Sequence, residues 1–133
     1  MLKLVRTNSI TRDRIALALM LAASLAALYA FVKAIGIATG AGPQTQQVEW
    51  WRVLGFLMFT GLFALLAFGP RRYPGLWELV ILDKAALTVV ELGLIGNQAA
   101  NAASSAIADG ILTVILLAAY VLTSGWRSWK RPT

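Results

Sequence analysis

The pattern of apolar and polar positions divides the chain into four long apolar stretches joined by short polar connections. The stretches cover about 15–37, 53–68, 76–95 and 102–123. A helix needs roughly 17–25 mostly apolar residues to cross the hydrocarbon core of a bilayer, and each stretch is close to that length. The pattern therefore predicts an all-α protein, with a single integral membrane domain over 1–133 that forms a four-helix up-down bundle.

The first two connections contain residues that end helices. Gly40, Gly42 and Pro43 follow the first stretch, and Gly69, Pro70, Pro74 and Gly75 follow the second. Proline removes a backbone donor and glycine admits a positive φ, so both interrupt a helix. Short connections make consecutive helices antiparallel neighbours, which favours the up-down arrangement. The third stretch is the least apolar of the four, and hydropathy alone would miss it most easily.

The composition supports a membrane protein and excludes several kinds of chemistry. Hydrophobic residues make up 59% of the chain and charged residues 14%, against about 45–50% and about 25% in soluble domains. So small a chain has too little interior to hide this excess, which is expected to face lipid. It contains no cysteine and no histidine, so disulfides, thiol nucleophiles, Ser-His-Asp triads and Cys or His metal sites are excluded. A carboxylate-only metal site stays open, but we expect no cofactor.

The basic residues predict how the chain is oriented. In a four-span topology, nine of the twelve Lys and Arg residues fall on one side: Lys3, Arg6, Arg12, Arg14, Arg71, Arg72, Arg127, Lys130 and Arg131. Short segments rich in Lys and Arg stay in the cytoplasm, so both termini are expected there. An odd number of spans would scatter these clusters over both sides. Because the basic tails adjoin the spans directly, we expect them to contact anionic lipid headgroups rather than nucleic acid.

The first stretch has an alternative interpretation. A basic segment followed by an apolar run is also typical of a secretory signal peptide. Here the apolar run exceeds the usual length of roughly 7–15 residues, and no Ala-x-Ala site closes it. A membrane helix is therefore favoured.

Small residues predict how the helices pack, and aromatic residues predict which positions lie at the membrane interface. Alanines recur every fourth residue in the first stretch, at Ala18, Ala22, Ala26, Ala30 and Ala34. Such a ladder lets a neighbouring backbone approach closely, which favours packing within the bundle, with a dimer face as the alternative. Trp and Tyr favour the headgroup level. Accordingly, Trp50 and Trp51 are expected at the outer interface, and Tyr73, Trp77, Trp126 and Trp129 at the inner one.

Charged residues inside the apolar stretches are the candidates for function. Each costs about 2.5–3.5 kcal/mol at bilayer depth on insertion scales and is normally kept only facing protein or a water-filled cavity. Lys84, Thr88 and Glu91 follow i, i+4, i+7 spacing and share one helix face, and Asp83 lies about 100° around from Lys84. Counting the rise per residue puts Asp109 of the fourth stretch at much the same depth as Glu91. Glu78, near the inner interface, is expected to form a solvated salt bridge with Arg71 or Arg72.

These positions predict a polar cavity in the outer half of the protein, with Lys84 beneath it. The candidate binding residues are Lys33, Arg52, Asp83, Lys84, Glu91 and Asp109. Intramembrane ionisable groups are functional candidates by default. The alternative is purely structural, with ion pairs that only fix the register of the helices.

Several short motifs resemble a known family. They are Trp51-Arg52-Val53-Leu54-Gly55, then Gly61-Leu62, then Pro70-Arg71-Arg72-Tyr73-Pro74, then Lys84 in the third stretch and Asp109-Gly110 in the fourth. Together they are similar to small bacterial four-helix membrane proteins related to the DoxX family, over about 50–129. The chain departs from that pattern at Asp83, where a glycine is expected, and at Glu91. The resemblance implies the fold, the bacterial cytoplasmic (inner) membrane and a Lys84–Asp109 pair, but no particular activity.

Three classes of function follow from the sequence. The first is a non-enzymatic membrane protein, either an accessory subunit or a small-molecule binder. The second is a small transporter that uses Glu91 and Asp109, although small multidrug transporters rely on a glutamate in the first span and none occurs in 15–37. The third is a membrane enzyme acting on a lipid or a quinone, but no nucleophile–base spacing and no Gly-x-x-x-x-Gly-Lys loop is present. The expected partners are membrane lipids and a second copy or a partner membrane subunit.

Overall fold

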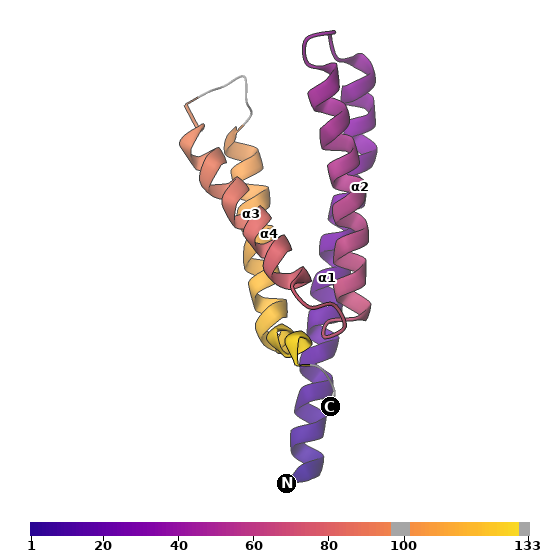
Figure 1. Cartoon of the computed structure of the whole chain (residues 1–133), viewed down its shortest axis with the longest axis vertical. Coiled ribbons are helices and arrows are strands. Elements are labelled where there is room, and N and C mark those ends of the chain that lie inside the picture. Colours follow the sequence, from indigo (N-terminus) through magenta and orange to yellow (C-terminus); the bar gives the residue numbers. More distant parts are fainter. Residues whose placement is uncertain (97–101, 131–133) are drawn as a thin grey trace.

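Over the residues that the structure describes, the fold consists of four antiparallel helices and one short 3-10 helix. The computed structural model describes residues 1–96 and 102–130, and every regular element within these ranges is helical. The elements are α1 (Leu2–Gly40), α2 (Gln46–Phe68), α3 (Leu76–Gly93), α4 (Ala102–Thr123) and the 3-10 helix η2 (Gly125–Trp129). The prediction of an all-α protein with four up-and-down helices is therefore confirmed (Figure 1).

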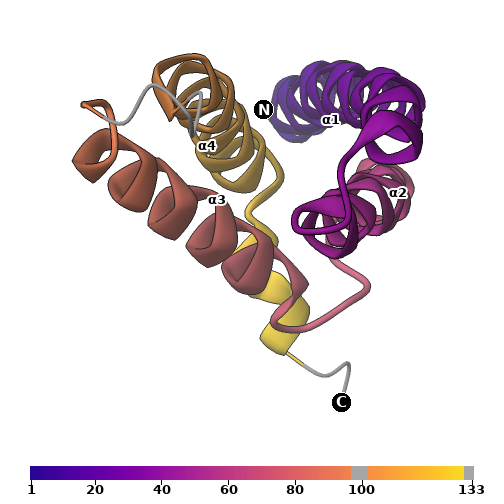
Figure 2. The same ribbon diagram turned by 90° about the horizontal axis from the view of Figure 1, so that it is seen from above.

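The helices form two hairpins that meet at one end. Helix α1 packs along α2 and α3 packs along α4, while α1 also contacts α4. Helices α2 and α3 contact each other little. From the joined end the hairpins diverge, so the molecule is V-shaped rather than a closed bundle (Figures 1 and 2).

Helix α1 is longer than the predicted stretch. It begins at Leu2 rather than near residue 15 and covers 39 residues, or roughly 58 Å at 1.5 Å per residue. Neither glycine nor proline occurs before Gly36, so nothing in the sequence interrupts the helix earlier. Its basic N-terminal part extends past the other helices at the joined end (Figure 1).

The cations gather as predicted. The N-terminal part of α1, the α2–α3 connection and η2 all lie at the joined end of the molecule (Figure 1). These segments carry seven of the nine clustered Lys and Arg residues, Lys130 follows η2 directly, and Arg131 lies outside the described residues. The start of α2, with Arg52, lies at the opposite end.

Three helices, α1, α2 and α4, are long and apolar enough to cross a membrane. The exception is α3, because four of its 18 residues are charged. Its outward face is nevertheless apolar, since Leu79, Leu82 and Val89 are each about two-thirds exposed. Continuous apolar surface of this kind is unusual on soluble proteins.

Buried side chains concentrate where the hairpins meet. The largest fully buried ones are Trp77, Phe63, Met20, Leu66, Leu116 and Val53. All except Val53 belong to one cluster, to which α1, α2, α3 and α4 each contribute. The hydroxyl of Ser24 donates to the backbone oxygen of Thr60 at 2.8 Å, which ties α1 to α2. This cluster fixes the joined end of the V.

The alanine ladder does not pack as one face. Of its members, Ala34 is buried, whereas Ala18, Ala22 and Ala26 are exposed. Each four-residue step turns a helix by about 400°, so the ladder advances about 40° per step and winds around α1. Packing within the bundle was therefore a wrong prediction for most of the ladder. The alanines that do pack are mainly those offset from it: Ala16, Ala23, Ala27, Ala34 and Ala38.

This difference in burial predicts different effects on stability for leucine substitutions at neighbouring alanines. Ala23→Leu is expected to destabilise the protein by about 1–3 kcal/mol, because it overfills a core in which Ala23 is almost fully buried. Ala22→Leu is expected to be nearly neutral, because Ala22 is exposed. Thermal unfolding of both variants in the same detergent measures the difference. Equal losses would show that α1 is rotated from the orientation described.

Candidate functional site: a cleft between the two hairpins

A buried lysine lies at the centre of the charged residues. Lys84, in the middle of α3, is almost fully buried. Its Nζ lies 3.3 Å from Oδ1 of Asp109 on α4 and 3.6 Å from Oδ2 of Asp83. The antiparallel α3–α4 hairpin places Lys84 level with Asp109, so the pair links the two helices. The Lys84–Asp109 pair that the family resemblance implies is thus present.

The same ammonium group contacts the other hairpin. Nζ of Lys84 lies 4.0 Å from the centroid of the Phe59 ring on α2. A cation over an aromatic face is attracted by the ring quadrupole, more strongly where water is excluded. Since α2 and α3 contact each other little, this contact is one of the few connections across that side of the V.

A cavity of about 380 Å³ lies between the hairpins beside this lysine. Small side chains of α1 form one wall, among them Ala22, Ala26 and Ala30. Phe56, Phe59 and Phe63 of α2 also line it, and α4 contributes further apolar residues. Lys84, Asp109 and Ser105 supply its polar groups. Pockets that hold small molecules typically measure about 300–1,000 Å³ and combine apolar walls with a few polar groups.

The sequence builds this cavity through residue size and spacing. Phe56, Phe59 and Phe63 follow i, i+3, i+7 spacing, so the three rings share one face of α2. The centroids of Phe59 and Phe63 are 5.5 Å apart, which fixes part of that wall. On the neighbouring helix of the same hairpin, alanine side chains of α1 are too short to fill the space between the diverging hairpins. A cavity is therefore left between this hairpin and α4.

Glu91 belongs to the same group of charges. It shares a face of α3 with Lys84 and lies close enough to Asp109 for their carboxyl groups to interact. Its Oε2 atom is buried and accepts no hydrogen bond from the described residues. Three carboxyl groups, those of Asp83, Glu91 and Asp109, thus surround Lys84. The structure brings together four of the six candidate residues.

The other two candidates form no ion pair with this group among the described residues, although the charge of Arg52 acts on Glu91. Arg52 pairs with Glu49, one turn earlier on α2, at 3.2 Å. Lys33 is exposed, and its Nζ lies 6.0 Å from the centroid of the Tyr29 ring. Neither Lys33 nor Arg52 lines the cavity between the hairpins, so the predicted lining is wrong for these two residues. The reason is the divergence of the hairpins, which separates the open ends of α1 and α2 from those of α3 and α4.

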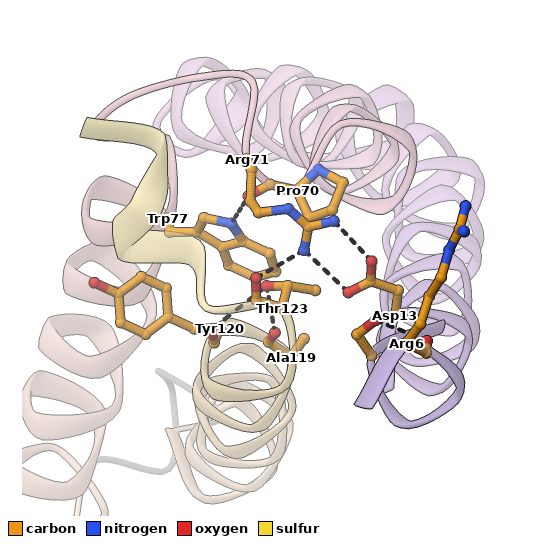
Figure 3. Close-up of polar contacts among 9 residues, drawn as sticks. Arg6, Asp13, Pro70, Arg71, Trp77, Ala119, Tyr120 and Thr123 are labelled. Atoms are coloured by element: carbon orange, nitrogen blue, oxygen red, sulfur yellow. Dashed lines mark hydrogen bonds and ion pairs between the residues drawn. The ribbon is translucent and has the colours of Figure 1, made fainter. Parts of the chain in front are cut away.

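At the joined end, Arg71 connects three segments of the chain (Figure 3). Its guanidinium donates to both carboxylate oxygens of Asp13 on α1, at 3.0 and 2.7 Å, and to the backbone oxygen of Thr123 at 2.8 Å. The hydrogen bonds to Asp13 hold the pKa of Arg71 above its ordinary value. Arg71 thereby ties α1 and the end of α4 to the α2–α3 connection.

Two predictions about this end were wrong. Glu78 pairs with neither Arg71 nor Arg72, because its Oε1 accepts from the hydroxyl of Tyr120 at 3.0 Å and from Nε1 of Trp129 at 3.1 Å. Trp77 is fully buried rather than interfacial. Its Nε1 donates to the backbone oxygen of Pro70 at 2.7 Å, which satisfies the indole inside the protein (Figure 3).

One important residue was not singled out from the sequence. A Cβ atom on Gly125 would lie 2.6 Å from Trp77 Cδ1 and 2.6 Å from Tyr120 Cδ2. Only glycine therefore lets η2 pack against these two rings. A glycine just after an apolar helix signals the helix end, but the close contact depends on the tertiary fold.

The chain matches no protein-family model, no curated protein and no solved structure. The site itself is therefore the basis for a functional proposal. The fold sets the class of protein. Every regular element in 1–96 and 102–130 is helical, and three of the helices are long and apolar enough to cross a membrane.

Proposed function

We propose that this protein is a four-span membrane protein that binds a small, uncharged amphiphile in the cleft between its hairpins and does not act as an enzyme. The observation that carries the proposal is the apolar cavity with the Lys84–Asp109 pair on its wall. The relation to the DoxX family, based on the motifs around Arg52, Arg71 and Lys84, is part of the same proposal.

The charges of the cavity indicate the chemistry of the ligand. Lys84 and Asp109 are the charged residues that line it, and their formal charges cancel. A ligand with a net charge would be buried without a partner, which is costly. A hydroxyl or carbonyl group can instead bond to the ammonium, and a hydroxyl can also donate to the carboxylate. The Phe and Ala side chains accommodate an apolar body.

The membrane supplies both the ligand and its route. Because α2 and α3 contact each other little, helix packing does not close the cleft on the side between these two helices. An amphiphile dissolved in the bilayer would enter there. In this arrangement α3 also crosses the membrane, in addition to α1, α2 and α4. Its residues Leu79, Leu82 and Val89 face lipid, and its buried Lys84 faces α4.

The proposed topology has a direct test. Reporter fusions after Gln44 are expected to report the outer side, whereas fusions after Arg72 and at Thr133 are expected to report the cytoplasm of a bacterial host. The reason is the gathering of cations at the joined end. A C-terminal fusion that reports the outer side would rule out four spans with this orientation.

Photolabelling tests the proposed ligand class. The probe is a diazirine analogue of decanol, added to the full chain in lipid nanodiscs. Labelling is expected on cavity residues such as Phe59, Ala26 and Ile111. Decanol should compete well with the probe. Decanoate and decylammonium should compete more weakly, because each brings an unpaired charge to the cavity.

A matched pair of variants controls this experiment. Ala22→Leu combined with Ala26→Leu fills the cavity and should remove the labelling. Ala18→Leu changes an exposed member of the same ladder that does not line the cavity, and should leave it intact. Labelling spread evenly over the lipid-facing surface in all three proteins would refute a specific site.

A further inference from the structure

A second hollow lies at the joined end of the molecule, away from the cleft. Its volume is about 550 Å³, and it lies between the N-terminal part of α1, the α2–α3 connection and the chain that follows α4. Each of these three segments contributes one arginine: Arg12, Arg71 and Arg127. In Figure 3, the Arg71 end of this region is drawn with its hydrogen bonds.

The charges around this hollow do not cancel. Asp13 is the one acidic residue that lines it, and its carboxylate is already paired with Arg71 at 2.7 Å. Arg12 and Arg127 therefore leave a formal surplus of two positive charges. Neither forms an ion pair with any residue in 1–96 or 102–130.

The end of helix α4 would repel an anion if it were uncovered, because its last backbone oxygens carry partial negative charge. Two of these oxygens are covered. Arg12 donates to the backbone oxygen of Val121 at 3.2 Å, and Arg71 donates to that of Thr123 at 2.8 Å. Each guanidinium has five donors, so further donors of Arg12 stay free. The side chains of Asn8 and Ser124 add neutral donors to the lining.

We propose that this hollow binds a phosphate group between Arg12 and Arg127. The planar guanidinium fork matches phosphate oxygens in a bidentate manner, which makes arginine a preferred phosphate ligand. The phosphate belongs either to an anionic lipid headgroup or to a soluble phosphate compound. The headgroup is the favoured source, because the hollow lies at the end where the cations gather. This site does not depend on a ligand in the cleft. Its position at the cytoplasmic leaflet rests on the proposed topology.

Binding to the purified full chain in a neutral detergent tests this site. The probes are dioctanoyl phosphatidylglycerol, dioctanoyl phosphatidylcholine and inorganic phosphate, with affinity measured at constant ionic strength. Phosphatidylglycerol is expected to bind, and phosphatidylcholine at least tenfold more weakly. The Arg12→Gln, Arg127→Gln pair should weaken phosphatidylglycerol binding at least tenfold.

The control pair is Arg14→Gln with Lys130→Gln, which removes the same charge near the hollow but outside its lining. It should retain binding. A loss of phosphatidylglycerol binding confined to the Arg12→Gln, Arg127→Gln pair supports the proposal. The source is a lipid if phosphatidylglycerol binds more tightly than inorganic phosphate, and a soluble compound if the order is reversed. Equal effects of both pairs would show general attraction to a basic surface and overturn the proposal. Single Arg127→Gln, which removes no hydrogen bond of its guanidinium within the described residues, should weaken binding in the same direction without loss of thermal stability.

Discussion

Lys84→Met is expected to destabilise the protein more than replacement of any one of its acidic neighbours. The change leaves Asp83, Asp109 and Glu91 without the cation they surround. Stranding one charge of a buried pair typically costs about 3–5 kcal/mol. Asp109→Leu should cost less, because Asp83 still lies 3.6 Å from the ammonium. The free energy of unfolding in a mild detergent measures both effects.

A double variant and a surface control sharpen this test. Lys84→Met combined with Asp109→Leu should be more stable than Lys84→Met alone, because it removes a stranded carboxylate along with its partner. Glu49→Gln breaks the exposed pair with Arg52 and should cost only about 0–1 kcal/mol. If Lys84→Met proved as mild as Glu49→Gln, the lysine would not be the buried centre of this charge group.

Gly125→Ala is expected to give the second large effect. The new Cβ would lie 2.6 Å from atoms of Trp77 and Tyr120, so one of these rings must move. Overfilling a packed region typically costs about 1–3 kcal/mol. Movement of the rings would also strain two hydrogen bonds, from Trp77 to the Pro70 backbone and from Tyr120 to Glu78. Unfolding temperature is the measurement.

A second glycine provides the control with the opposite sign. Gly61 lies within α2, and a Cβ there would meet nothing within 4 Å. Gly61→Ala should therefore raise stability by about 0.5–1 kcal/mol, because alanine loses less backbone entropy in a helix. If both variants behaved alike, η2 would not pack against Trp77 and Tyr120 as described.

The helices were predictable because each depends on a local pattern. Long apolar runs and the breakers after Gly40 and Gly69 define the hairpins, and α3 could be recognised in spite of its charges. The start of α1 was missed because most of its residues in 2–14 are polar or basic. That segment is still helical, since it contains neither glycine nor proline.

The candidate site was predictable only in part. The Lys84–Asp109 pair was implied only by the family resemblance. Rise per residue gives the depth of a side chain along one axis, and it correctly placed Asp109 near Glu91. It carries no information on the distance between hairpins, so Lys33 and Arg52 were assigned to a cavity that neither residue lines. Arg52 instead pairs with Glu49, a partner three residues away.

Contacts made by the connections were the hardest to foresee. Trp77 has the position of an interfacial residue in the sequence, yet the α2–α3 connection folds so that the Pro70 backbone accepts from its indole. The role of Gly125 likewise depends on two rings that are distant in sequence from one another. Such contacts are set by tertiary packing rather than by periodicity.

Native mass spectrometry of the full chain released from lipid bilayers tests the central claim most directly. The wild-type protein is expected to carry a small noncovalent adduct, because the 380 Å³ cavity would retain its amphiphile. The Ala22→Leu, Ala26→Leu variant should lack the adduct while it stays folded. A wild-type spectrum without an adduct, or the same adduct on both proteins, would contradict a ligand held between the hairpins.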